Sequence, residues 1–337
     1  MKKKLLLLLL ISTLFINSCS KNIYKGQFFD LFDTFCEVIF YSTSEEQFTE
    51  HALELQAEFE EYSMLYDIYK DYEGLNNLKT VNDNAGIKPV KVDKKIIDLL
   101  NYSKKMYKKT DGNVNIAFGS VLKIWHKYRE EAERIPTIEE LKIANEHTNI
   151  DDIIINEAES TVFLRDPEMS IDVGSIGKGF AVEEVSKLIE SKERDNILIS
   201  IGGNVKSIGP KLSGKPWSVG IQNPDTDSEK PYILRVMLDD MSLVTSGDYQ
   251  RFYMYEGKKY HHIVNKDTLM PSDKFVSVSV LASDSALSDA LTTALFNMDF
   301  EEGSNLVESM EGVEAVWIKK DKEIIFSSGF EEYVIKE

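Results

Sequence analysis

Between residues 196 and 281 the chain is almost entirely short strands, and this run limits the fold more than any other segment. It includes NILISIG, ILRVML and VSVSVLA, which are rich in β-branched residues and bounded by turn formers. Helical periodicity is strongest outside it, at 45–70 and 283–298. Because strand and helix clusters alternate irregularly, we predict an α+β fold with a largely antiparallel sheet, and not a doubly wound one.

The rest of the chain also divides into strands and helices. The segment QFFDLFDTFCEVIFYS (27–42) is rich in aromatic and β-branched residues, which predicts a strand. No repeat or linker interrupts the sequence, so we predict one domain over 27–337. The further expected helices are 93–109, 136–147, 180–192 and 301–310, and the further expected strands are 152–156, 161–164, 314–318 and 323–327.

The N-terminus has the pattern of an export signal. Three lysines precede an apolar run from Leu5 to Ile16, which is too short to favour a permanent membrane span. The run ends in INSC, which resembles a bacterial lipobox. We therefore predict a signal peptide at 1–18, a lipidated Cys19 and a short tether at 19–26. Lipid chains would hold the protein on the extracytoplasmic face of a bacterial cell membrane. The alternative is an ordinary secretion signal, or a short anchor, in which Cys19 is incidental.

The composition excludes several classes of function. The net charge of −18 argues against nucleic acid or an anionic membrane surface as the main partner. An anionic ligand would need local help from backbone N–H groups, a lysine or a metal ion. With Cys19 lipidated, Cys36 alone is left, so we expect no disulfide and no cysteine-based zinc site, and Cys36 is expected in the core. The chain has no G-x-S-x-G or H-E-x-x-H motif either.

The segment MSIDVGSIGKGFAVEEV (169–185) is the first candidate for a binding site. It is predicted as a strand, a glycine-rich turn and a helix, but its glycine spacing matches neither common nucleotide motif. Backbone N–H groups at the helix start would face an anion, with charge added by Lys178, while Asp172 would accept from a ligand. The same glycines also suit a turn that only allows close packing.

Three further segments carry polar residues at strand or helix ends. SIGGNV (200–205) and VTSGDYQRF (244–252) both place small or polar residues after a strand, and either fits an ordinary turn. In KYHHIVN (259–265) the neighbouring histidines would point to opposite faces of a strand, so they cannot jointly bind one metal ion.

A possible metal pair lies in SDALTTALF (288–296). Asp289 and Thr293 stand four residues apart, hence on one face of the predicted helix. A carboxylate and a hydroxyl make an oxygen-rich pair suited to Mg²⁺. Spacing alone favours the more ordinary interpretation, in which Asp289 is solvated and Thr293 bonds back to the helix backbone.

Taken together and in this order, the segments resemble the ApbE-type FAD:protein FMN transferases. The matching segments are FDTFCEV (32–38), TDGNVNIAFGSVLKIW (110–125), DVGSIGKGFAVEE, SIGGNV, TSGDYQR, HHIVN with MP shortly after, and SDALTTALF. The resemblance runs from about residue 28 to the C-terminus. It implies a T-fold-like α+β architecture and an exported enzyme. Such an enzyme uses FAD and Mg²⁺, transfers FMN to a threonine or serine of an extracytoplasmic redox protein, and releases AMP.

The resemblance also implies roles for individual residues. It makes Asp172 an FAD-binding residue, and it makes the carbonyl of Ser175, with Asp289 and Thr293, the ligands of Mg²⁺. His262 would lie near the flavin phosphate and, with Asp289, is a candidate catalytic residue, because the acceptor hydroxyl needs a proton sink. The other implied cofactor-binding residues are Phe32, Tyr69, Asn113, Val114, Asn115, Lys178, Gly203 and Ser246.

The chain departs from the family pattern in three places, and two other functions stay open. Asn115 stands where an aspartate is common, DYEGLNNLKTVN replaces an S-E-[IL] segment, and NKDTLMP lacks a glycine after the histidine. These changes bear on pocket shape and leave the metal pair intact. The alternatives are an FAD pyrophosphatase that gives FMN and AMP, and a lipid-anchored flavin-binding protein without turnover.

Overall fold

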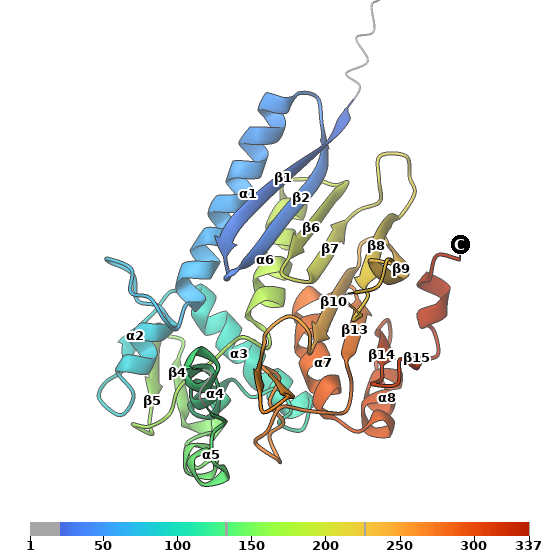
Figure 1. Ribbon diagram of the computed structural model, residues 1–337. Coiled ribbons are helices and arrows are strands. Elements are labelled where there is room, and N and C mark those ends of the chain that lie inside the picture. The colour runs from blue at the N-terminus through green and yellow to red at the C-terminus, as the bar shows by residue number, and fades with distance from the viewer. Residues whose placement is uncertain (1–20, 132–133, 226, 337) are drawn as a thin grey trace, which may run out of the picture.

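The computed structural model describes residues 21–131, 134–225 and 227–336, and its centre is an eight-stranded sheet (Figure 1). Every neighbouring pair in this sheet is antiparallel. The predicted α+β class with an antiparallel sheet is therefore confirmed. In spatial order the strands are β1 (Asn22–Leu31), β2 (Thr34–Ser42), β6 (Ile197–Ile201), β7 (Asn204–Ile208), β10 (Ser242–Gly247), β13 (Ser277–Ala282), β14 (Glu314–Ile318) and β15 (Ile324–Phe326).

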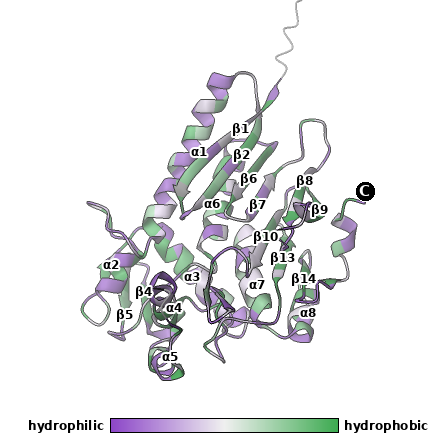
Figure 2. Ribbon diagram, in the orientation of Figure 1, coloured by the Kyte–Doolittle hydropathy of each residue, from purple (hydrophilic) through white to green (hydrophobic). Residues whose placement is uncertain are grey.

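Helices and a small hairpin cover the sheet, and the apolar colouring of Figure 2 is concentrated on the strands between them. Helix α1 (Glu45–Tyr66) packs on the sheet through one apolar face. Its buried residues Phe48, Leu55, Phe59 and Tyr62 recur at helical spacing and join the main core. A second core lies under the hairpin β8 (Trp217–Gln222) and β9 (Tyr232–Leu238) with the turn η3 (Phe330–Tyr333). The other helices that contribute to the main core include α3 (Lys94–Lys109), α6 (Gly177–Ser191), α7 (Ser285–Asn297) and α8 (Phe300–Glu308), alongside α1 (Glu45–Tyr66).

Smaller elements surround the lower end of the sheet in Figure 1. Helix α4 (Gly119–Glu131) packs with the hairpin β11 (Phe252–Tyr255) and β12 (Lys258–His261) in a third apolar cluster. Trp125 anchors α4 there, because its indole N–H donates to the carbonyl of Leu269 at 3.0 Å. The remaining elements are α2 (Leu78–Asp83), β3 (Val90–Lys91), η1 (Ile116–Phe118), α5 (Ile138–Asn145), η2 (Ile150–Asp152), β4 (Ile153–Asn156) and β5 (Thr161–Leu164).

The N-terminal strand region differs from its prediction. The expected single strand at 27–42 is a hairpin, broken by Phe32 and Asp33, which both have positive φ (53° and 51°). Such two-residue hairpin turns usually carry Gly, Asn or Asp, so a phenylalanine at the first position hides the turn from sequence reasoning. The predicted tether at 19–26 is wrong in part, because β1 already begins at Asn22 and pairs with Ser42.

Other expectations concern the thiol and the membrane. Cys36 is fully buried, as predicted, and burial raises the pKa of its thiol to about 11. The predicted lipidation residue, Cys19, lies outside the described residues. Within the part of the chain that the structure describes, no helix is both long and apolar enough to span a bilayer.

A buried ion pair joins β7 to α6 and to the start of α7. The Lys206 ammonium lies 3.3 Å from Glu183 Oε2, and the two side chains are only 6% and 12% exposed. Glu183 Oε2 also accepts from the N–H of Ser285 at 2.9 Å, and Lys206 donates to the carbonyl of Ser283. The pair thus fixes where α7 begins against α6.

Replacing Glu183 by alanine should lower the free energy of unfolding by about 3 kcal/mol, because it leaves Lys206 buried without a counter-charge. The matched control is Glu184→Ala, one residue along the same helix. Its partner Lys187 is 56% exposed, so the loss there should stay below about 1 kcal/mol. Urea unfolding of the two variants measures the difference, and equal losses would contradict a structural role for the buried pair.

Candidate functional site

The site is built around the start of α6, which has no cap of its own. Its N-cap position is Ile176, whose side chain caps nothing. The N–H of Gly179 instead donates to Asp289 Oδ2 of α7 at 2.7 Å, and Asp289 is 4% exposed. A carboxylate at this place satisfies an orphan N–H and faces the positive end of the helix dipole. The structure therefore brings together two segments that the sequence separates by 110 residues.

Three oxygens predicted as metal ligands remain free at this junction. Among the described residues, no hydrogen bond reaches Asp289 Oδ1 or the Thr293 hydroxyl. The carbonyl of Ser175 also lacks a donor within the described chain, because the Gly179 N–H that a regular helix would give it goes to Asp289. A carboxylate, a hydroxyl and a carbonyl form an oxygen donor set that fits Mg²⁺. No cluster of three or more His, Cys, Asp or Glu side chains able to hold a metal occurs in residues 21–131, 134–225 and 227–336, so any metal here depends on this mixed set.

Ser246 is linked to the same helix through Thr292. The Ser246 hydroxyl donates to Thr292 Oγ1 at 2.9 Å, and Thr292 donates to the carbonyl of Asp289 at 2.7 Å. The predicted residue Gly203 lies in the β6–β7 turn with φ of +89°, and its carbonyl accepts from the N–H of Thr245 at 3.3 Å. The end of β10 is therefore bonded both to α7 and to the β6–β7 turn.

The two neighbouring histidines have separate environments, as the sequence predicted. His261 is buried, and its Nε2 bonds to the carbonyl of Ser272 at 2.6 Å. His262 follows the end of β12, and its Nδ1 lies 3.3 Å from the carbonyl of Arg251. Burial lowers the pKa of His262 to about 3, with smaller contributions from the charges of Arg251 and Lys178. His262 is thus neutral at pH 7, and two cations face it.

A second group of side chains lies around Tyr69, and sequence reasoning missed part of it. The Tyr69 hydroxyl is 2.7 Å from Nδ1 of His126, which lies on α4. Burial lowers the pKa of His126, and the charges of Asp172, Arg129 and Arg251 also act on it. Trp125 and Tyr128 stand three residues apart and mark the buried face of α4. The same helical spacing places His126 and Arg129 together on another face.

Asp172 is buried and held by the glycine turn. Its Oδ1 accepts from the N–H of Gly174 at 2.8 Å, and its own N–H donates to Ile116 at 2.9 Å. Its charge acts on both Tyr69 and His126. Lys178, one turn on, donates to the carbonyl of Gly174 at 3.3 Å. The carboxylate of Asp172 thus faces the Tyr69 group.

The remaining predicted residues are engaged mainly in the fold. Phe32 is half-buried in the β1–β2 turn, where its N–H donates to Ser63. Asn113 donates to the carbonyl of Thr110, and Val114 is 1% exposed with its N–H donated to Thr110 Oγ1 at 3.1 Å. Asn115 uses both ends of its amide: Oδ1 caps η1 at Ala117, and Nδ2 donates to Thr148. Ligand contacts at these residues stay predictions.

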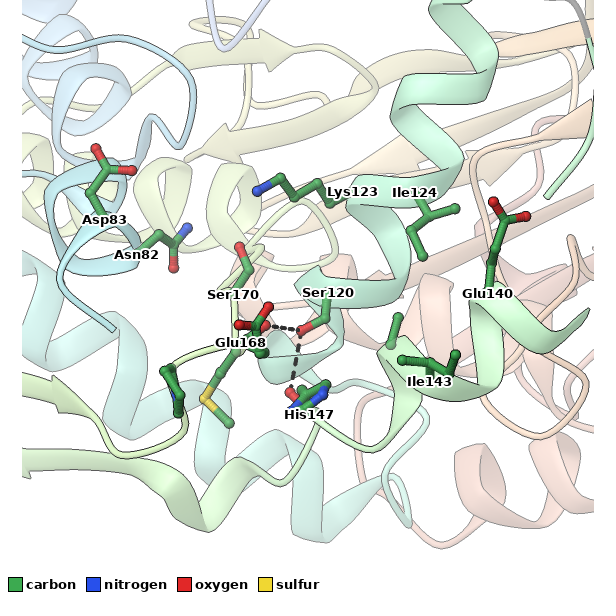
Figure 3. A pocket seen from close by; sticks show the side chains of 13 residues that line it. Asn82, Asp83, Ser120, Lys123, Ile124, Glu140, Ile143, His147, Glu168 and Ser170 are labelled. Carbon is green, nitrogen blue, oxygen red and sulfur yellow. Dashed lines mark hydrogen bonds between the residues drawn. The ribbon is translucent and has the colours of Figure 1, made fainter. Parts of the chain in front are cut away.

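A separate hollow of about 350 Å³ lies between α4, α5 and residues 167–170 (Figure 3). None of the predicted site residues lines it. It contains Ser120 and His147, and His147 pairs with Asp166 at 2.7 Å, which are the residue types of a nucleophilic triad. The Ser120 hydroxyl, however, bonds to the carbonyls of His147 and Glu168, as the dashed lines show, and not to the imidazole. The geometry is therefore structural.

The sequence of this chain is similar to those of several known proteins. The sequence pattern of the ApbE family matches residues 32–317. An FAD:protein FMN transferase of Klebsiella pneumoniae is 29% identical over 274 residues, which cover 79% of this chain and 84% of that protein. A protein of the same name from Treponema pallidum is 33% identical over 266 residues, covering 75% of this chain and 73% of the relative.

Solved structures show the same fold. The ApbE protein from Thermotoga maritima superposes with a TM-score of 0.83 at 24% identity, covering 94% of this chain and all of that one (100%). The flavin transferase ApbE from Vibrio cholerae gives a TM-score of 0.77 at 22% identity, covering 93% and 100%. The T-fold-like architecture expected from the sequence resemblance therefore agrees with these neighbours.

Proposed function

This chain belongs to the ApbE family, and we propose on that premise that it is an FAD:protein FMN transferase. It moves the FMN part of FAD to a threonine or serine hydroxyl of an extracytoplasmic redox protein and releases AMP. The acceptor oxygen bonds to the phosphorus on the flavin side of the pyrophosphate. The bond from that phosphorus to the bridging oxygen breaks, and the hydroxyl proton passes to a base.

The observation that carries the proposal is the junction of α6 and α7. There, among the described residues, a buried carboxylate keeps one oxygen without a hydrogen bond, as do the Thr293 hydroxyl and the Ser175 carbonyl, next to the N-terminus of a helix. Asp289, Thr293 and the Ser175 carbonyl would hold Mg²⁺, which supplies neutralisation of the pyrophosphate charge when bound. That help matters in a protein of net charge −18.

The chain's own cations and dipoles add to this. Lys178 and Arg251 place positive charge around His262, where the flavin phosphate would lie. The start of α6 presents backbone N–H groups to phosphate oxygens. Because the pKa of His262 is near 3 without ligand, His262 is a weak base at neutral pH. It therefore suits hydrogen bonding to a phosphate, and the carboxylate of Asp289 is the other candidate to take the proton.

Incubation with FAD, Mg²⁺ and an acceptor protein tests the proposal. Covalent fluorescence on the acceptor, with one AMP released per flavin bound, is the expected result. AMP and FMN released at turnover rates without acceptor labelling would instead indicate an FAD pyrophosphatase. Intact FAD after long incubation would indicate a flavin-binding protein without turnover, and either outcome would overturn the proposal.

Two adjacent threonines separate metal binding from folding. Thr293→Val should raise the Mg²⁺ concentration needed for half-maximal transfer by about tenfold, the equivalent of about 1.4 kcal/mol of lost ligand interaction. Stability should change little, since no hydrogen bond to its hydroxyl occurs in the described residues. Thr292→Val is the control: it loses bonds to Ser246 and to the Asp289 carbonyl, so it should lower stability by about 1 kcal/mol. A reversed pattern would contradict the ligand assignment.

The place of the enzyme is also a proposal. The lipobox-like INSC around Cys19 supports anchoring on the extracytoplasmic face of a bacterial cell membrane, where the acceptor would also lie. Metabolic labelling with a fatty-acid analogue should mark the wild-type protein and not a Cys19→Ser variant. Labelling of both proteins would show that the lipid is attached at a residue other than Cys19.

A further inference from the structure

Tyr69 lies in the loop that joins α1 to α2. It follows the end of α1 at Tyr66 and precedes α2, which begins at Leu78. Its side chain is 56% exposed, and its backbone N–H is tied only to Asp67, two residues back. An exposed aromatic side chain in such a loop has several rotamers available, so a binding role for Tyr69 requires something that fixes its ring.

His126 supplies that fixed point. The Tyr69 hydroxyl lies 2.7 Å from His126 Nδ1, and the two ring centroids are 6.0 Å apart. His126 follows Trp125 on α4, and Trp125 is 3% exposed and bonded to the carbonyl of Leu269. The histidine is therefore attached to a rigid helix, whereas the tyrosine is not.

We propose that His126 is a positioning residue for the flavin nucleotide: its Nδ1 accepts a hydrogen bond from the Tyr69 hydroxyl and so holds the Tyr69 ring as a wall on which a planar ring of FAD stacks. This inference rests on the proposed function, because it takes FAD as the ligand. A tyrosine ring offers a large flat contact area with few rotatable bonds, and its value as a wall depends on its being held in place.

The protonation states agree with this arrangement. Burial lowers the pKa of His126, and a tyrosine keeps its proton at neutral pH, so the imidazole is neutral and the phenol can donate. The charged groups that act on His126 are Asp172 before α6, Arg251 after β10, and Arg129 and Glu130 on its own helix. As the pH falls through the lowered pKa, Nδ1 gains a proton and can no longer accept from Tyr69.

The test is a double-mutant cycle on FAD affinity, measured by flavin fluorescence without acceptor protein. Tyr69→Phe and His126→Ala should each weaken binding about fivefold, the equivalent of about 1 kcal/mol for one hydrogen bond. The double variant should be no weaker than the weaker single, because both changes remove the same bond. His126→Gln, which keeps an acceptor, should recover part of the loss, and kcat at saturating FAD should change less than twofold or so.

Two measurements of FAD affinity distinguish this positioning role from a general loosening of the loop that contains Tyr69. Tyr72→Phe removes a hydroxyl bonded to Asp67 in the same segment, and it should leave FAD affinity unchanged. The wild type should lose affinity as the pH is lowered through the depressed pKa of His126, a loss that Tyr69→Phe should not show. Equal weakening by Tyr72→Phe, or additive losses in the double variant, would overturn the inference. A wild type that neither binds FAD nor transfers FMN would overturn the proposed function instead.

Discussion

Asp289→Ala is expected to lower the rate of FMN transfer by about 10³-fold at fixed Mg²⁺. It removes the only charged member of the proposed ligand set, and charge neutralisation on a transferring phosphoryl group is worth several kcal/mol, each 1.4 kcal/mol or so being tenfold in rate. Transfer is measured as covalent fluorescence on the acceptor, and Mg²⁺ dependence is measured across a wide concentration range.

Asp289→Asn separates the two tasks of this side chain. An asparagine oxygen can still accept from the Gly179 N–H, which is 2.7 Å from Asp289 Oδ2, so the start of α6 should keep its partner. The amide lacks the charge, so transfer should recover only in part and only at raised Mg²⁺. Flavin binding should survive in both variants, because Asp172, Lys178 and Arg251 are untouched. Normal transfer by Asp289→Ala, with an unchanged Mg²⁺ requirement, would refute the metal assignment.

The fold could be predicted from the sequence where periodicity is long and capped. Helix α1 begins at Glu45, as expected, because Ser44 caps it and a buried residue recurs each turn. The hairpin at Phe32–Asp33 could not be predicted, since its turn residues adopt positive φ without glycine. Helix α4 is not among the expected helices, and it begins at a glycine, Gly119. In the structure a Cβ there would lie 2.3 Å from the carbonyl of Ser170, so the glycine allows a close approach.

The candidate site likewise has parts that the sequence predicts and parts that it does not. The glycine-rich turn predicts Asp172 and Lys178 as site residues from a few neighbouring residues, whereas Asp289 is predicted through the family resemblance. The bond between Asp289 and the Gly179 N–H depends on how α6 packs against α7, which no local pattern contains. The sequence did contain one indication. The residue at the N-cap of α6 is Ile176, whose side chain cannot cap the helix, so the free N–H groups there need a partner from another part of the chain.

Charge shows how the sequence and the structure complement each other. The net charge of −18 predicts that an anionic ligand needs local cations, but it does not say where they are. In the structure the charges of Lys178 and Arg251 act on His262, and those of Arg251 and Arg129 act on His126. These cations come from three separate segments of the chain, so an acidic protein can still bring positive charge to a local site.

Gly179→Ala should disable the site through packing alone. A Cβ built on Gly179 lies 2.4 Å from the Cβ of Asp289 and 2.4 Å from the carbonyl oxygen of Ser285. One neighbour is backbone and the other is bound directly to it, so α6 and α7 must move apart. Overpacking of this kind costs up to about 3 kcal/mol, and a shift near 1 Å at a reacting centre costs about 10²-fold in rate. We expect transfer to fall by at least that factor in protein that remains folded.

Gly177→Ala is the matched control, two residues earlier in the same helix. Its added Cβ would meet Val173 Cγ2 at 3.1 Å, a side-chain contact that a small rotation relieves. It should therefore keep near-normal transfer and Mg²⁺ dependence. Both proteins are compared at a temperature where far-ultraviolet circular dichroism shows them folded, so that lost activity reports the position of Asp289 and not unfolding. If Gly179→Ala folds and transfers FMN as well as Gly177→Ala does, the close approach of the two helices is not what places Asp289 for its task.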